Sequence, residues 1–214
     1  MGWRERARRA AGLSRQLRLR VTDLYQRLYW DLRDLLPRLR AAADSNAVEV
    51  RVLFVCLGNI CRSPLAEGIF GQQLARIGLA DRVGVDSAGT SGWNIGKRPH
   101  WKARACAARH GIAIGHRRAR MFMPADFDRF DRILVMDRRN RQDVLSLAPH
   151  GRAAGRVRLL LDFAGGGDIP DPIDGTAADF ESVFHQIEAA CDGLVADVAR
   201  ELNHRGATAT VARR

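Results

Sequence analysis

The sequence lacks most features of secreted and membrane-spanning proteins. It holds 4 cysteines among 214 residues, without paired spacings, whereas small secreted domains are dense in disulfides. No apolar run comes near the roughly 20 residues that span a bilayer, and no segment has the form of a cleavable signal peptide. We therefore expect a soluble protein of the cytoplasm, which is a reducing compartment.

Lysine is almost absent as well. Lys97 and Lys102 are the two lysines, so arginine supplies nearly all of the positive charge behind the net +11. This bias runs through the whole chain, which favours an origin in genome composition over a nucleic-acid-binding code. The excess charge is uneven, since residues 1–46 hold eleven arginines against five acids, a net +6 that leaves +5 for the remaining residues.

Residues 1–46 are expected to form a basic amphipathic helical arm. Its apolar side chains recur at spacings of three and four residues, at Leu13, Leu17, Val21, Leu24, Leu28, Leu32, Leu35 and Leu39. We favour packing of this stripe on the rest of the chain or on a second copy of it. A helix lying on an anionic membrane surface, as a peripheral attachment, is the alternative, while nucleic-acid contact and an organellar targeting segment are less favoured.

The segment Val52–Pro64 carries the strongest chemical signal. An apolar strand ends in Cys56, and Arg62 follows six residues later, directly before the helix-opening pair Ser63 and Pro64. A helix that begins there leaves backbone N–H groups without partners, and its dipole adds positive potential. Together with the planar fork of Arg62, such a loop binds a tetrahedral oxyanion and stabilises the Cys56 thiolate, which is the nucleophilic form.

This segment resembles the low-molecular-weight protein tyrosine phosphatase family. The similarity begins at residue 49, extends to the region of residue 200, and includes in matching order Asp86–Gly96, Arg109–Ile112, Phe130–Asp137, Ile169–Pro172 and Asp179–Glu181. It implies cysteine-dependent hydrolysis of protein phosphotyrosine through a phosphocysteine intermediate, with no metal and no cofactor. Residues 1–46 have no counterpart in the family.

The resemblance assigns further roles outside the loop. Asp171 corresponds to the general acid that protonates the leaving oxygen and then, as a base, activates water. Its prolines on either side limit the conformations that would move the carboxyl group. Ser87 and a histidine, matched here with His116, complete a hydrogen-bond network around the cysteine, although Gly115–Arg120 carries one extra residue.

The phosphate-binding loop is expected to comprise Leu57, Gly58, Asn59, Ile60, Cys61 and Ser63 beside Cys56 and Arg62. Gly58 and Asn59 tolerate strained dihedrals, and Ser63 can donate its hydroxyl to the cysteine sulfur. By resemblance, Cys61 captures an oxidised Cys56 as a disulfide, which would make the activity redox-sensitive. At position 60 the chain resembles the phosphotyrosine-specific members, because it has the branched apolar residue Ile60 where protein arginine phosphatases of this fold have threonine.

Substrate selection is where the chain departs from the family. Trp93 matches an aromatic wall of the substrate cleft, but Ile173 and Asp174 stand where eukaryotic members often have aromatic residues. One stacking wall is thus missing, and Asp174 places negative charge at the cleft rim. The usual Pro-Asp-x-Arg element is also replaced, by Pro99–Lys102.

The pattern of the chain predicts an α/β fold with a parallel sheet that helices cover on both faces, and the resemblance implies a sheet that is four-stranded and doubly wound. We expect a phosphatase catalytic domain over residues 47–205 and a flexible tail over residues 206–214. Strands are predicted at Val50–Val55, Arg82–Ser87, Arg132–Met136 and Val157–Leu161. Helices are predicted at Pro64–Ile77, His100–His110, Arg138–Leu147 and from Ala177 to the region of Leu202.

Three alternative functions stay open at this point. An arsenate reductase of the same fold would need two further cysteines close together, whereas Cys106 and Cys191 are far apart in the sequence. Another phosphomonoesterase activity is the second alternative. The third is a module that binds phosphorylated partners without turnover, which the presence of both Cys56 and Asp171 disfavours.

Overall fold

The structure is a computed structural model that describes residues 48–148 and 155–211. The chain divides into two units, Met1–Ala47 and Val48–Arg214, and the arm predicted over residues 1–46 lies outside the described residues. In chain order, the second unit contains β1 (Val50–Cys56), α2 (Arg62–Arg76), β2 (Val83–Gly89), α3 (Trp101–Arg109), α4 (Asp126–Arg129), β3 (Arg132–Val135), α5 (Arg138–Ser146), β4 (Val157–Leu159), the 3-10 helix η1 (Leu160–Phe163) and α6 (Ala177–Val211).

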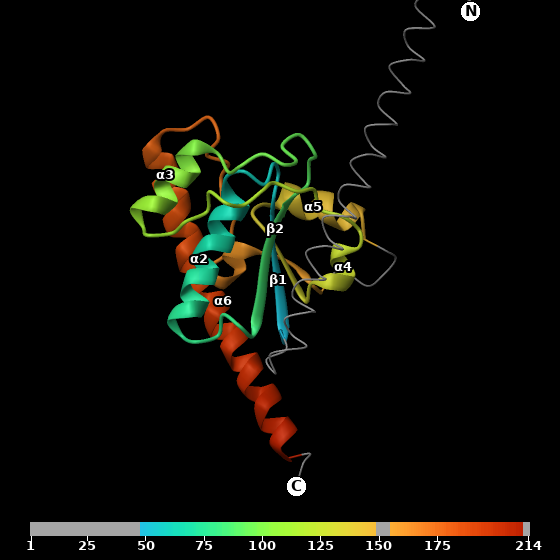
Figure 1. The fold of residues 1–214 in the computed structure, drawn as a ribbon. Coiled ribbons are helices and arrows are strands. Elements are labelled where there is room, and N and C mark those ends of the chain that lie inside the picture. The colour runs from blue at the N-terminus through green and yellow to red at the C-terminus, as the bar shows by residue number, and fades with distance from the viewer. Residues whose placement is uncertain (1–47, 149–154, 212–214) are drawn as a thin grey trace, which may run out of the picture. The chain divides into compact units, whose positions relative to one another are not determined.

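The four strands form one parallel sheet in the order β2-β1-β3-β4. Helices α2, α3 and α6 cover one face of it, and α4 and α5 lie on the other (Figure 1). The strand β1 is central and buried except at Arg51, which explains its continuous apolar sequence. The predicted doubly wound sheet is confirmed. Because β2 and β3 lie on opposite sides of β1, the strand order reverses at β1, and the loop after Cys56 lies at the switch point where such sheets bind ligands.

The core on the α2 and α6 side is built from large apolar side chains. Phe54 of β1 meets Phe70 of α2 edge to face, with ring centroids 5.6 Å apart, and Phe180 and Phe184 of α6 are fully buried. Burial of one such side chain contributes about 1.5–3 kcal/mol. These contacts fix α2 against β1, and so they fix the two ends of the loop between them.

Several element boundaries differ from the sequence prediction. The strand predicted to reach Leu161 ends at Leu159, because the chain turns into η1 and packs against α6. Helix α4 was not predicted, since one helical turn has no readable periodicity. Helix α6 continues to Val211, beyond the predicted end near Leu202 and into the predicted tail, of which residues 212–214 lie outside the described residues.

Helix α6 begins at a local capping arrangement. The Asp179 carboxylate accepts hydrogen bonds from the Thr176 amide at 2.6 Å and from the Thr176 hydroxyl at 2.8 Å. The hydrogen bond from the Thr176 amide holds the pKa of the Asp179 carboxyl group below its usual range. This cap fixes the start of the helix immediately after the loop that carries Asp171.

In the described part of the chain, no helix has both the length and the hydropathy that a membrane crossing needs.

Candidate active site

The loop between β1 and α2 turns its carbonyl groups outward. Asn59 adopts a left-handed conformation with φ of 52°, which asparagine tolerates better than most residues. Three loop carbonyls accept hydrogen bonds from amides outside the loop: Thr90 N to Cys56 O at 2.8 Å, Ser91 N to Leu57 O at 2.9 Å and His100 N to Ile60 O at 2.7 Å. Peptide planes held in this way direct amide groups toward the inside of the loop.

The inward amides lie at the start of α2. Within the described ranges, the backbone N–H groups of Gly58, Ile60 and Cys61 donate to no protein acceptor. Helix α2 has no side-chain cap and no acidic residue in its first turn, so its dipole is not neutralised locally. Unpaired amides and the positive helix end together form an anion-binding site.

Strand β2 ends directly beneath this loop at Gly89. A Cβ atom on Gly89 would stand 2.8 Å from the Leu57 carbonyl oxygen and 3.0 Å from the Asn59 nitrogen, which is too close for any side chain. Glycine at this position therefore allows the loop to rest on the sheet.

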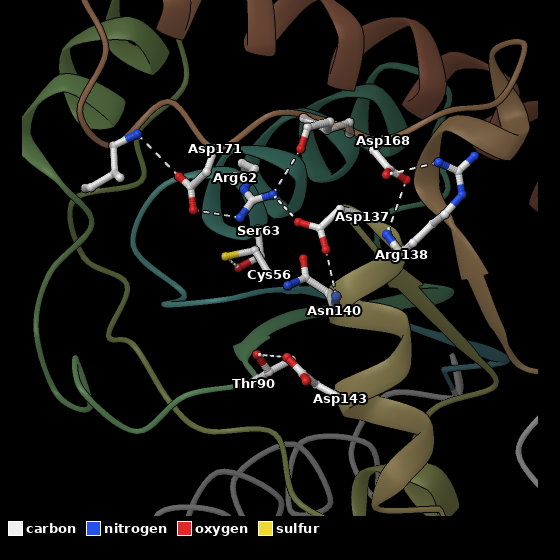
Figure 2. A network of polar contacts seen from close by, with 12 residues as sticks. Cys56, Arg62, Ser63, Thr90, Asp137, Arg138, Asn140, Asp143, Asp168 and Asp171 are labelled. Carbon is white, nitrogen blue, oxygen red and sulfur yellow. Dashed lines mark hydrogen bonds and ion pairs between the residues drawn. The ribbon is translucent and has the colours of Figure 1, made fainter.

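Arg62 is the most constrained cation of the site. Its side chain is 3% exposed, and Nη1 donates to Asp137 Oδ2 at 2.7 Å and to the Ile169 carbonyl at 2.9 Å, while Nη2 donates to Asp171 Oδ2 at 2.7 Å (Figure 2). Its Nε is buried and has no partner among the described residues. Burial opposes the charged form, but the charges of Cys56 and Asp171 and the bond to Asp137 raise the pKa of Arg62.

Cys56 lies at the inner end of the loop, with donors close to its sulfur. The Ser63 Oγ is 3.1 Å from Sγ, and the Asn59 amide donates to Sγ at 3.3 Å. Figure 2 shows Cys56 and Ser63 side by side below the Arg62 guanidinium. Donors arranged around a sulfur stabilise its thiolate form, both as a nucleophile and as a leaving group.

Asp171 reaches the site from the loop between η1 and α6. Its side chain is 35% exposed, and Oδ1 accepts the Ile173 amide at 3.3 Å. Each carboxylate oxygen of Asp171 thus has its own donor: the Ile173 amide for Oδ1 and the Arg62 guanidinium for Oδ2. Ile173 is half-buried and packs partly against the core, whereas Asp174 and Trp93 are exposed, Trp93 by 77%.

Two anchors position the loop that carries Asp171. The Lys102 Nζ of α3 donates to the Gly175 carbonyl at 2.6 Å. At the other end, Asp168 accepts hydrogen bonds from the Arg138 amide and guanidinium, both at 3.2 Å (Figure 2). Lys102 belongs to the segment that departs from the family pattern, and the structure gives it this anchoring contact.

The predicted network residues have different outcomes. Ser87 does join the site, since Asn59 Nδ2 donates to its Oγ at 2.9 Å. His116 does not: it is exposed, and among the described residues only its carbonyl takes part in a hydrogen bond. The extra residue in Gly115–Arg120 places Arg117 there instead, in contact with Glu67.

Three residues of the site were not among those predicted from the sequence: Asp137, Glu67 and Arg117. Asp137 stands at the carboxyl end of β3, where it contacts Arg62 and also caps α5 by accepting the Asn140 amide at 2.6 Å. A polar residue directly after an apolar strand of a parallel sheet is a readable signal. Glu67 carried a weaker sequence signal, because it is a charged residue on the buried face of α2. Arg117 carried no sequence signal of its role.

One cluster outside the site offers metal-ligand atoms. Cys106 Sγ, His110 and Glu181 place ligand atoms within 4.8 Å of one another. The Glu181 carboxylate already accepts His110 Nε2 at 2.8 Å and Arg109 Nε at 2.7 Å. A guanidinium on that carboxylate supplies the positive charge that a metal ion would bring, and the contacts tie α3 to α6.

Comparison with known proteins gives consistent results. The family model described as "Low molecular weight phosphotyrosine protein phosphatase" matches residues 51–204. The low molecular weight protein-tyrosine-phosphatase of Streptomyces coelicolor is 41% identical over 162 residues, covering 73% of this chain and 98% of that protein. The human low molecular weight phosphotyrosine protein phosphatase is 39% identical over 149 residues, covering 65% and 90%.

Solved structures agree with these relatives. The crystal structure of YfkJ from Bacillus subtilis is similar with a TM-score of 0.67 and 38% identity, covering 72% of this chain and 98% of that one. The similarity spans nearly the whole of that chain.

Proposed function

Because the chain belongs to the low molecular weight phosphotyrosine protein phosphatase family, we propose that it hydrolyses protein phosphotyrosine by way of a phosphocysteine intermediate. One observation carries the proposal: Arg62 is buried with an unpaired Nε beside the unpaired loop amides. Buried donors without acceptors are costly, and a phosphate dianion supplies several acceptors at once. Asp137 and the Ile169 carbonyl hold Nη1, so the fork of Nε and Nη2 is presented to the phosphate.

In the first step the Cys56 thiolate attacks phosphorus and the bond to the phenolic oxygen breaks. The leaving oxygen takes a proton from Asp171. The Asp171 carboxyl group lies 2.7 Å from Arg62 Nη2. A bound phosphate dianion competes for Nη2, which releases the Asp171 carboxyl group from this contact and lets it face the leaving oxygen.

In the second step Asp171, now ionised, accepts a proton from a water molecule. The oxygen of that water attacks the phosphocysteine, the phosphorus–sulfur bond breaks, and inorganic phosphate is released. The departing Cys56 thiolate is stabilised by the Ser63 hydroxyl and by the Asn59 amide. The same two donors therefore serve attack in the first step and departure in the second.

The arsenate reductase alternative lacks support in the geometry. Cys106 and Cys191 are fully buried on α3 and α6. Burial raises the pKa of both thiols, that of Cys106 to about 11. Neither is a reactive thiol on a mobile segment, so a relay of electrons from Cys56 to a second cysteine pair is not favoured.

Turnover of a phenyl phosphate ester by the full-length protein tests the proposal. Cys56→Ser should abolish turnover and keep substrate binding, while Asp171→Asn should slow kcat by about 10²–10⁴, the usual contribution of a general acid. The Asp171→Asn defect should shrink for leaving groups that need no proton. Asp174→Asn, at an exposed rim position, is the matched control and should stay within a few-fold of wild type.

Substrate class is measured on the same protein with a panel of phosphorylated peptides. The exposed Trp93 ring offers an apolar face to a phenol ring, so phosphotyrosine should be favoured over phosphoserine. The proposal is wrong if Cys56→Ala retains substantial activity, and its substrate assignment is wrong if phosphoarginine is the better substrate.

A further inference from the structure

A continuous chain of polar contacts runs from Cys56 into the interior. The Ser63 hydroxyl lies 3.1 Å from Cys56 Sγ, and Asn59 Nδ2 lies 2.9 Å from Ser63 Oγ and 2.9 Å from Ser87 Oγ. Ser87 Oγ in turn lies 2.7 Å from Glu67 Oε2. All five residues are at most 5% exposed, so water does not replace these contacts.

The direction of the protons along this chain is fixed. The Asn59 Oδ1 accepts the Arg120 amide at 2.9 Å, which assigns Nδ2 as the donor to both serines. Each serine hydroxyl has a single proton, and it must point away from Asn59. Ser87 therefore donates to Glu67, and the Ser63 proton goes to Cys56 Sγ or to the Ala88 carbonyl, which is 3.2 Å away.

This direction requires an acceptor at the end of the chain. An ionised Glu67 accepts the proton of Ser87. If a protonated Glu67 instead donated to Ser87 Oγ, the Ser87 proton, which already points away from Asn59, would lose its acceptor. Burial alone favours the protonated form of a carboxyl group, so a compensating positive charge is needed to keep Glu67 ionised.

Arg117 supplies that charge. Its Nη1 contacts Glu67 Oε1, the carboxylate oxygen that Ser87 does not use, and the side chains are 21% and 7% exposed. The segment that carries Arg117 lies close to α2, because Ile112 and Ile114 approach Gly68 so nearly that a Cβ there would stand 2.8 Å and 2.7 Å from them. The contact between Arg117 and Glu67 is therefore built into the packing.

Other charged groups near α2 have different partners. On β2, Asp86 pairs with Arg120, which also contacts Asp126. The thiols that α3 and α6 contribute, Cys106 and Cys191, are buried with raised pKa values and stay neutral. On α2 itself, Arg62 is held by Asp137 and Asp171. Arg117 is thus the cation in contact with Glu67.

We infer that Arg117 is a positioning residue for the reaction: its permanent charge keeps Glu67 ionised, so that Ser87 goes on donating to Glu67 and holds the Asn59 side chain, and with it the loop around Cys56, in place across the working pH range. The inference rests on the proposed function for its catalytic consequence. A guanidinium does not titrate in this range, so the orientation of the network does not vary with pH.

The test compares pH profiles of kcat for an aryl phosphate in wild type, Arg117→Gln, Arg117→Lys and Arg118→Gln. In Arg117→Gln the buried Glu67 carboxyl group should gain a proton as pH falls. The acid limb of the kcat profile should therefore move up by about one pH unit, and at pH values below the acid limbs of both proteins kcat should be about tenfold lower than in wild type. Activity at pH 8 should stay within a few-fold. Arg117→Lys should keep the wild-type shape, as should Arg118→Gln, which alters an exposed neighbouring arginine.

A double variant separates this role from a merely structural one. With Glu67→Gln there is no proton to gain, so Glu67→Gln/Arg117→Gln should recover the wild-type shape of the acid limb, at a lower amplitude. The inference is overturned if Arg117→Gln lowers kcat equally at every pH, or if the shifted limb persists in the double variant.

The rate of Cys56 alkylation by iodoacetamide is a second readout that needs no turnover. Its dependence on pH should shift in Arg117→Gln and not in Arg118→Gln. If the wild type failed to hydrolyse aryl phosphates, the proposed function would fail while this profile still tested the inference. Circular dichroism identifies a variant that does not fold, and Arg117→Lys then provides the remaining comparison.

Discussion

At the scale of single residues, the site depends on side chains that each make several directional contacts. Asn59 provides the left-handed turn of the loop, donates to two serines and accepts the Arg120 amide. Arg62 divides its nitrogens between structural acceptors and the side presented to phosphate. Conservative replacements at such positions remove a defined contact, so their effects can be interpreted atom by atom.

Cys61 gives a prediction at this scale. It is 3% exposed within the loop, and burial, with the negative charges of Cys56 and Asp171, raises its pKa. After mild peroxide treatment, a dithiol should restore wild-type activity, whereas loss should be largely irreversible in Cys61→Ser, because a sulfenic acid on Cys56 then has no thiol with which to form a disulfide and release water.

The sign of the pH effect follows from the raised pKa of Cys61. Its thiolate fraction is small at neutral pH and grows as pH rises, so disulfide formation should become faster and the recoverable fraction larger. Cys106→Ser, at a buried cysteine outside the loop, is the control. Equal recovery in wild type and Cys61→Ser would remove the protective role.

At the scale of elements, helix α6 is held to the sheet by both apolar and ionic contacts. Arg132, at the start of β3, contacts Asp197 and donates to Glu201 Oε2 at 2.6 Å. The bond to Arg132 holds the pKa of Asp197 below its usual range, and for Glu201 the contacts with Arg132 outweigh burial and lower the pKa as well. These contacts of Arg132 hold α6 against the sheet, and the first turn of α6 follows directly after the loop that carries Asp171.

Arg132→Gln should lower the free energy of unfolding by about 1–2 kcal/mol at pH 7, because two charged hydrogen bonds are lost. Carboxyl groups with depressed folded-state pKa values stabilise the fold above about pH 4 and lose that contribution as pH falls through the folded value. The difference from wild type should therefore shrink in acid, as measured by urea unfolding at several pH values.

Arg200→Gln is the matched control for this measurement. Arg200 also contacts Asp197, at 3.1 Å, but its side chain is 72% exposed, so its removal should change stability little. A deficit in Arg132→Gln that stayed constant down to pH 3 would contradict the ionic explanation.

At the scale of the whole molecule, residues 1–46 and the catalytic unit call for separate functions. Every residue placed in the site lies beyond residue 55. Deleting residues 1–46 should thus leave kcat for a small soluble ester within a few-fold of the full-length value. The deletion should change assembly or location instead, either by lowering oligomeric size or by abolishing sedimentation with anionic vesicles, the latter in a salt-dependent way.

Size-exclusion chromatography and vesicle sedimentation of both forms distinguish these outcomes. Neutral vesicles are the control, since electrostatic attraction requires anionic lipid. A truncated protein that failed to fold would overturn the division, because it would show that the leucine stripe is part of the core of the catalytic unit.

The sequence by itself determined the sheet, the nucleophile and the loop. Apolar runs alternating with helical segments specify a parallel sheet whatever the surrounding packing, and the spacing from Cys56 to Arg62 is a local property of one turn and one helix start. Asp171 was found because prolines and a resemblance mark its loop, although it lies 109 residues from its partner Arg62.

Only the tertiary structure decided which distant side chains meet. One extra residue between Ile112 and Arg120 turns His116 to the solvent and brings Arg117 to Glu67, and no local pattern reports such a shift. The end of β4 was likewise set by packing on α6, since an apolar run fits either a strand or a turn. Contacts between residues far apart in the chain depend on the packing of whole elements, which is why Asp137, Glu67 and Arg117 became visible only in the fold.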